Sequence, residues 1–115
     1  MIKDETYNGY PNYETWVVKL WIDNDQSEQE YWLENTRERL NYAAETDSIA
    51  THEKHATYDL AEYLKNEFTE GFFETFQIHS DTNNVYIDLM LHELGNVDWL
   101  TIARHLIEDA SEVLS

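Results

Sequence analysis

The chain has 115 residues, a formal net charge of −17 at pH 7 and no cysteine. This length is typical of one domain, and the lack of cysteine excludes disulfide scaffolds, thiolate metal sites and cysteine nucleophiles. The charge lies far outside the magnitude of about 2–8 that is usual for a small soluble domain, and it argues against direct binding to nucleic acids or anionic membranes, which needs clustered Lys and Arg.

The first predicted elements are an irregular arm and a helix. The arm extends through Pro11 and contains Asn8-Gly9, a turn signal. Asn12 is a suitable N-cap for a helix over residues 13–24. Apolar residues at i, i+1, i+4 and i+5 predict one apolar face on this helix, with both tryptophans buried. These residues are Trp16, Val17, Leu20 and Trp21.

Two longer helices are predicted next. Ser27 and Glu30 have the spacing of a capping box at the start of a helix over residues 28–46. Thr51 is a candidate cap for a third helix, whose apolar period continues to Phe76. Gly71 lies inside that period, where a glycine can kink or break a helix.

The last third of the chain predicts a loop over residues 77–84 and two further helices. The fourth helix carries Val85, Tyr86, Leu89, Met90 and Leu94, and Gly95 ends it. Asp98 caps the fifth helix, which turns Trp99, Ile102, Ala103, Leu106, Ile107 and Ala110 inward. No segment alternates long enough for a strand. The expected fold is an all-α single-domain bundle of about five helices over residues 1–115, with an irregular N-terminal arm.

Targeting signals are absent from the sequence pattern. The N-terminal residues Met1-Ile2-Lys3-Asp4-Glu5 lack the basic region and apolar run of a signal peptide. No stretch approaches the roughly 18 consecutive apolar residues of a membrane span. The expected location is therefore the cytoplasm.

The run from Asn8 to Asp25 resembles a family of small, mostly uncharacterised proteins whose shared pattern is Asn-Tyr-Glu-Thr-Trp, then Leu-Trp, then Asn-Asp. Such proteins are encoded largely by phages, plasmids and integrated mobile elements. The segment 97–109 is similar to the closing segment of longer members. Members commonly carry Asn where this chain has Val17. The resemblance implies no established activity, but it implies a mobile-element context, in which accessory genes often encode inhibitors of host defence.

Carboxylates form rows on the second and third predicted helices. Successive charges in such a row stand roughly 5–6 Å apart, and a nucleic-acid duplex presents a phosphate about every 3.4 Å along each strand. Two neighbouring acidic helices can therefore approximate the charge density of a nucleic-acid backbone. The predicted partner-binding residues are Glu30, Glu34, Glu38, Asp59, Glu62, Glu67, Glu70 and Glu74.

These rows favour a binding protein over an enzyme. The leading hypothesis is an inhibitor of a host nucleic-acid-handling defence enzyme, of the anti-CRISPR or anti-restriction type, which occupies the basic groove of that host protein as a DNA mimic. The alternative is a non-catalytic structural or adaptor module of a mobile element, whose acidity serves solubility. A homodimer would extend the acidic surface, although no heptad pattern predicts one.

A metal-dependent hydrolase is a third hypothesis, built on His52 and His55. Their i, i+3 spacing differs from the i, i+4 spacing of a zincin helix, and a further ligand would have to come from elsewhere, such as His92 or His105. There is no Gly-rich phosphate loop and no nucleophile elbow. No metal and no cofactor is predicted.

Overall fold

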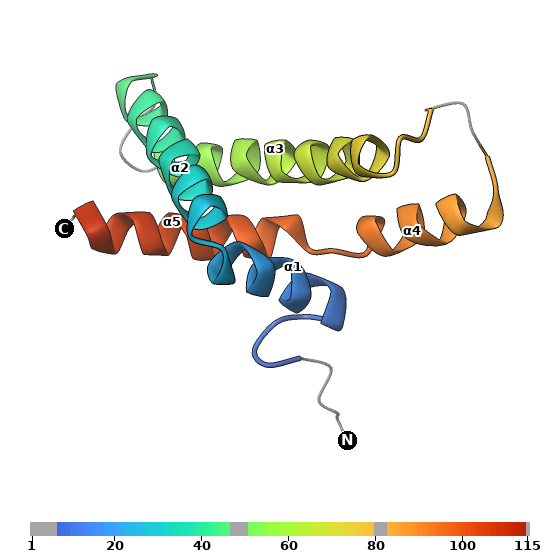
Figure 1. Cartoon of the computed structure of the whole chain (residues 1–115). Helices are drawn as coiled ribbons and strands as arrows, with labels where there is room; N and C mark the ends of the chain where they lie inside the picture. Colours follow the sequence, from blue (N-terminus) through green and yellow to red (C-terminus); the bar gives the residue numbers. More distant parts are fainter. Residues whose placement is uncertain (1–6, 47–50, 80–82, 115) are drawn as a thin grey trace.

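The computed structural model describes residues 7–46, 51–79 and 83–114, and five helices make up most of these ranges (Figure 1). They are α1 (Tyr13–Asn24), α2 (Gln26–Thr46), α3 (His52–Thr75), α4 (Val85–Gly95) and α5 (Trp99–Leu114). These ranges contain no β-strand, so the predicted all-α bundle is confirmed. No helix within them combines the length and the apolar composition that crossing a bilayer requires.

Two predicted N-caps are confirmed. Asn12 Oδ1 accepts a hydrogen bond from the backbone N–H of Thr15 at 2.9 Å, and Asp98 Oδ1 accepts one from Thr101 N–H at 3.1 Å. Each bond satisfies one of the backbone donors that the first turn of a helix leaves free. The first and fifth helices therefore begin where the sequence predicts.

The starts of α2 and α3 differ from the prediction. Asp25, and not Ser27, caps α2, because its Oδ1 accepts from Glu28 N–H at 3.1 Å. The helix consequently begins at Gln26, two residues earlier than predicted. Thr51 occupies the N-cap position of α3, but its side chain makes no capping hydrogen bond.

The end of α3 is set by Gln77 and not by Gly71. The helix passes through Gly71 without a break and ends at Thr75. Gln77 then adopts a left-handed backbone with φ of 55°, while Ile78 N–H donates to Phe73 O at 2.8 Å. This is the Schellman arrangement, in which glycine is the usual left-handed residue. The predicted loop over residues 77–84 follows, and its residues 80–82 lie outside the described ranges.

A Gln77→Gly variant is expected to be more stable than the parent chain by up to about 1 kcal/mol. A side chain in the left-handed region costs about 1–2 kcal/mol, and glycine removes this cost at the expense of some chain entropy in the unfolded state. Urea unfolding at an unchanged m-value would measure the gain. A loss of stability would show that the glutamine side chain contributes more than its backbone strain costs.

The hydrophobic core lies between α2, α3 and α5. In Figure 1, α3 runs alongside α5 and α4 in the opposite direction, α2 crosses these helices, and α1 lies beside α5. The buried cluster contains Ile22, Trp32, Leu40, Ala43, Ala56, Leu60, Leu64, Val97, Trp99, Ile102, Ala103, Leu106, Ile107 and Ala110. The predicted inward face of the fifth helix is therefore confirmed in full.

The buried face of α1 is not the predicted one. Its buried residues are Thr15, Lys19 and Ile22, whereas Trp21 is 69% exposed and Trp16 is only partly buried. The prediction that both tryptophans are buried is thus wrong for Trp21. Polar bonds determine which face α1 turns inward.

Lys19 pairs with one carboxylate on its own helix and with one on α5. Its Nζ donates to Asp23 Oδ1 at 2.8 Å and lies 3.8 Å from Asp109 Oδ2. A buried ammonium needs such partners, because desolvation without them is costly. Tyr10 packs nearby against the ring of His105, with centroids 4.9 Å apart, and burial raises the pKa of its hydroxyl.

The described part of the N-terminal arm folds back on α1. Asn8 and Gly9 form the predicted turn, with φ of 51° and 89°, and the backbones of Tyr7 and Tyr10 pair across it. The Tyr7 ring lies 4.9 Å from the Trp16 ring, between centroids. The arm therefore shields part of the apolar surface of α1. Residues 1–6 lie outside the described ranges.

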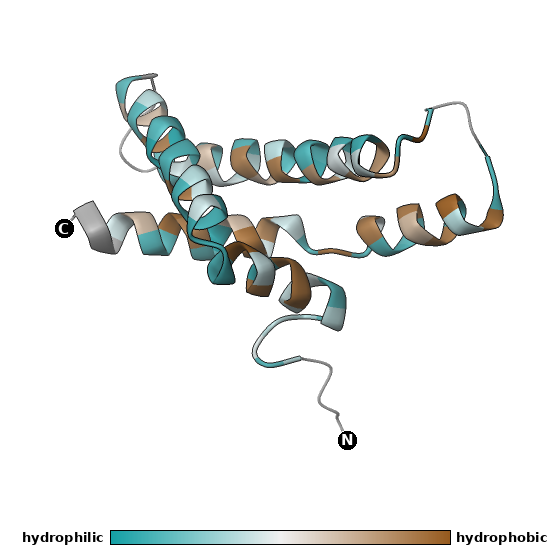
Figure 2. Ribbon diagram, viewed as in Figure 1, coloured by the Kyte–Doolittle hydropathy of each residue, from teal (hydrophilic) through white to brown (hydrophobic). Residues whose placement is uncertain are grey.

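Helix α4 lies outside the core and packs against the C-terminal half of α3 (Figure 1). Ile87 is its buried residue, and Leu94 touches the core cluster from its edge. The Cα radius of gyration is 15.7 Å, compared with about 13 Å for a compact domain of this length. The end of α3 and α4 thus project from the bundle, and hydrophobic residues are visible along α4 (Figure 2).

Candidate functional site

All eight predicted partner-binding carboxylates are exposed. On α2, Glu30, Glu34 and Glu38 share one side of the helix, and the buried residues Trp32 and Leu40 occupy the opposite side. Residues two apart on a helix differ by roughly 200° around its axis, which explains this separation. The α2 row therefore points away from the core over its whole length.

The α3 carboxylates divide into two groups. Asp59 and Glu67 face α2, because Asp59 Oδ2 lies 3.2 Å from Arg39 Nε and Glu67 Oε1 accepts from the Tyr31 hydroxyl at 3.3 Å. These two contacts set an antiparallel register between α2 and α3. The other predicted partner-binding carboxylates of α3 make no side-chain hydrogen bond or ion pair with any described residue. They are Glu62, Glu70 and Glu74.

Few of these carboxylates form ion pairs with described residues. Among the described residues the ion pairs are Lys19 with Asp23 and with Asp109, and Arg39 with Asp59. Asp59 is thus the only predicted carboxylate with a cationic partner in those ranges. Lys19 and Arg39 are themselves turned inward, and the Arg39 guanidinium lies 4.4 Å from the centre of the Tyr63 ring. The other seven predicted carboxylates on α2 and α3 make no ion pair with a residue that the structure describes.

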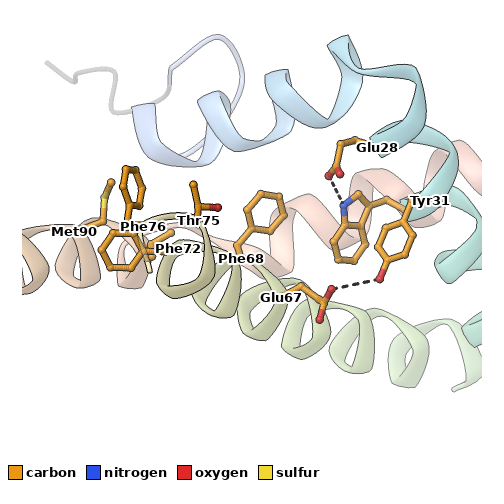
Figure 3. A pocket seen from close by; sticks show the side chains of 11 residues that line it. Glu28, Tyr31, Glu67, Phe68, Phe72, Thr75, Phe76 and Met90 are labelled. Atoms are coloured by element: carbon orange, nitrogen blue, oxygen red, sulfur yellow. Dashed lines mark hydrogen bonds between the residues drawn. The ribbon is translucent and has the colours of Figure 1, made fainter. Parts of the chain in front are cut away.

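An apolar groove between α2, α3 and α4 was not predicted from the sequence. It has a volume of about 440 Å³, and a second hollow of about 380 Å³ adjoins it where α3 meets α4. Figure 3 shows Tyr31 and Phe68 toward one end and Phe76 with Met90 at the other, and Trp32 also lines the groove. The two hollows share Phe72, Phe76 and Met90 in their linings.

Two carboxylates at the α2 end of this groove are held by hydrogen bonds (Figure 3). Glu28 Oε1 accepts from Trp32 Nε1 at 3.2 Å, and Glu67 accepts from Tyr31 as described above. The hydroxyls of Tyr31 and Tyr63 lie 2.6 Å apart, and this hydrogen bond, with burial and the nearby Glu67, raises the pKa of Tyr31 far above its ordinary value. The groove thus combines an apolar lining with a negative end.

The exposed apolar side of α4 continues this surface. Tyr86 is 78% exposed, Leu89 60% and Phe76, the residue that follows α3, 63%. A helix that packs on one side only should expose polar residues on the other. The signal was present in the sequence, because apolar residues surround most of α4 instead of one face, but periodicity alone did not indicate which residues would be covered.

The predicted histidine pair does not form a metal centre with other residues in the described ranges. His52 is partly buried near the start of α3, and His55 is exposed one turn later. No group of three His, Asp or Glu side chains in residues 7–46, 51–79 and 83–114 lies close enough to hold a metal ion. Lys54 and Arg104 line a separate hollow at this end of α3, whereas Arg37 lies on α2 between Glu34 and Glu38 and makes no ion pair with a described residue.

Comparisons with known proteins give one match. The model of a family of unknown function, DUF7249, matches residues 3–98. This range contains α1 to α4, with the Asn12-Tyr13-Glu14-Thr15-Trp16 segment, and stops before α5. No curated protein and no solved structure matches the chain significantly. Since the match covers most of its length, the chain belongs to the DUF7249 family.

Proposed function

We propose that this protein inhibits a host nucleic-acid-handling defence enzyme, of the restriction or CRISPR type, by placing the acidic faces of α2 and α3 in the basic groove of that enzyme. The supporting observation is the row Glu30, Glu34 and Glu38, which is exposed along α2 and makes no ion pair with any described residue. In this role the protein acts stoichiometrically, in the cytoplasm of the host of a phage or other mobile element.

The chemistry of such a complex follows from the charges. A groove lined with Arg and Lys attracts an acidic protein over long distances and accelerates their encounter. Once the complex forms, the carboxylates take the places of phosphates and exclude nucleic acid from the groove. Because exposed charges are screened by salt, with a Debye length of about 8 Å at physiological ionic strength, inhibition should weaken as salt rises.

Reversal of the α2 row should abolish most of the inhibition. We expect the triple variant Glu30→Lys, Glu34→Lys and Glu38→Lys to bind its target about a hundredfold more weakly, since each lost ion pair contributes up to about 1 kcal/mol. The target is first isolated from host lysate at low salt, eluted with rising salt and displaced by added duplex DNA. Its nuclease activity is then titrated with parent and variant.

A second triple variant controls for net charge. Glu53→Lys, Glu93→Lys and Glu108→Lys changes the total charge equally, at exposed positions on α3, α4 and α5 away from the row. We expect this variant to inhibit almost as well as the parent. Equal weakening by both triple variants would reduce the effect to net charge and contradict a specific mimetic face.

A structural or adaptor module remains the second candidate function. The exposed apolar side of α4 favours it, because contiguous apolar patches on soluble proteins commonly mark interaction sites. In this case the acidity serves solubility, and partner binding depends on apolar side chains and responds little to ionic strength. Elution of the bound partner with rising salt, as described above, therefore separates the two candidates.

A further inference from the structure

The apolar groove and the exposed side of α4 form one surface whose apolar side chains the proposed nucleic-acid mimicry does not use, although Glu67, one of the eight predicted carboxylates, lines the groove. The groove is lined by Trp32, Phe68, Phe72, Phe76, Met90 and Leu94, among others. Leu89 and Tyr86 extend the apolar surface onto the outer side of α4. An apolar area of this kind is unfavourable in water unless a partner covers it.

We propose that this groove binds a basic amphipathic helix of a partner protein. The apolar side of such a helix would cover Phe72, Phe76 and Met90, and its Lys or Arg side chains would meet Glu28 and Glu67 at the α2 end (Figure 3). Helix-in-groove recognition needs apolar anchors at i, i+3, i+4 and i+7 on the incoming helix. The proposal holds whether or not the partner handles nucleic acids.

Charge complementarity favours this occupant over others. A second copy of the chain would bring another formal charge of −17 to the same surface, and like charges repel. An acidic peptide or an anionic membrane is disfavoured for the same reason. The two carboxylates beside the groove are already oriented by their hydrogen bonds to Trp32 and Tyr31, so pairing with a cation requires little further ordering.

The groove is long enough for a short helix. Phe76 directly follows the last residue of α3 and lies eight residues after Phe68, which corresponds to about 12 Å along the helix axis. The second hollow extends the surface toward Tyr86. An incoming helix of two to three turns would therefore contact the whole lining. Two turns present enough anchors to define its orientation.

Gly71 lines the groove and permits a test that leaves all charges unchanged. A Cβ at this position would meet no atom within 4 Å, so a larger side chain enters open space in the groove. Glycine lowers helix stability relative to other residues by about 1 kcal/mol. A Gly71→Leu substitution is consequently expected to fill the groove without destabilising α3.

The experiment uses the full chain and a synthetic Leu/Lys amphipathic helix of about 18 residues, or five turns. Its control is a peptide of the same composition, scrambled so that no apolar face forms. Calorimetric titration should detect binding of the amphipathic peptide and at least about tenfold weaker binding of the scrambled one. Gly71→Leu should lower the affinity for the amphipathic peptide by a similar factor, since blocking the site of one anchor side chain is sufficient for this loss.

Gly95→Leu is the matched variant, because Gly95 is also helical, also has open space around it and lies outside both linings. It should bind the peptide as the parent does. If Gly71→Leu fails to fold, Phe76→Ala replaces it, since Phe76 is 63% exposed. Equal binding of the two peptides, or parent-like binding by the groove variant, would overturn the proposal. Light scattering provides a further check. If the parent chain is a dimer and Gly71→Leu is a monomer, the groove binds a second copy of the chain, and the proposal is overturned.

Discussion

A Trp32→Ala variant is expected to lose about 3–5 kcal/mol of folding free energy, the range for truncation of a buried tryptophan. Trp32 is 2% exposed, and its ring lies 5.5 Å from Tyr63 and 6.0 Å from Phe68, between centroids. The side chain therefore joins α2 to α3 and forms one wall of the apolar groove. Since domains are usually stable by only about 5–15 kcal/mol, this loss would remove between about a fifth and all of the folding free energy.

The same substitution on α1 provides the control. Trp21 is 69% exposed, so Trp21→Ala should change the stability by no more than about 0.5 kcal/mol. Both variants are compared with the parent by urea unfolding, in which the midpoint shifts at a constant m-value. Comparable losses in the two variants would mean that α1 packs through its tryptophans, contrary to the structure.

The number and the approximate limits of the helices could be predicted from the sequence, because they depend on local chemistry. Asn12 and Asp98 cap their helices with their own side chains, and this preference is local and strong. The cap of α2 shows the limit of such reasoning. Asp25 and Ser27 are both good caps in isolation, and the choice of Asp25 depends on how the chain leaves α1.

The buried face of α1 could not be predicted, because it depends on residues far away in the sequence. Apolar periodicity indicated Trp16 and Trp21, but Lys19 points inward to pair with Asp109 of α5. Thr15 also points inward and contacts the junction between α4 and α5. A hydrophobic pattern shows that a face is apolar, whereas specific long-range polar bonds determined which face is covered.

The acidic row on α2 could be predicted from local sequence, whereas the apolar groove could not. The α2 row was predictable, since the i, i+4 spacing places its members on one side of a helix and charged residues are rarely buried. The groove was not, because it requires that α4 packs beside Phe72 and Phe76 while Tyr86 and Leu89 remain uncovered. No local pattern distinguishes an apolar residue that packs in the core from one that stays exposed on the surface.

The Asn-Tyr-Glu-Thr-Trp segment has a structural role that can be tested at Thr15. This side chain is fully buried. Its hydroxyl donates to Asn12 Oδ1 and accepts from the backbone N–H of Asp98 at 2.8 Å. Asn12 Nδ2 in turn donates to Asn96 O at 2.8 Å. The segment therefore fastens the start of α1 to the junction between α4 and α5.

Thr15→Val is expected to cost about 1–3 kcal/mol, because it keeps the shape of the side chain but leaves the Asp98 N–H without its acceptor. Thr36→Val is the matched control. Thr36 is equally buried, but its hydroxyl donates to Trp32 O at 2.6 Å, within one helix. A carbonyl there still has its helical partner, and such back-bonding is slightly unfavourable, so its loss should cost less than about 0.5–1 kcal/mol. Equal losses in urea unfolding would attribute both to burial alone, and the segment would then stabilise α1 by packing instead of by this long-range hydrogen bond.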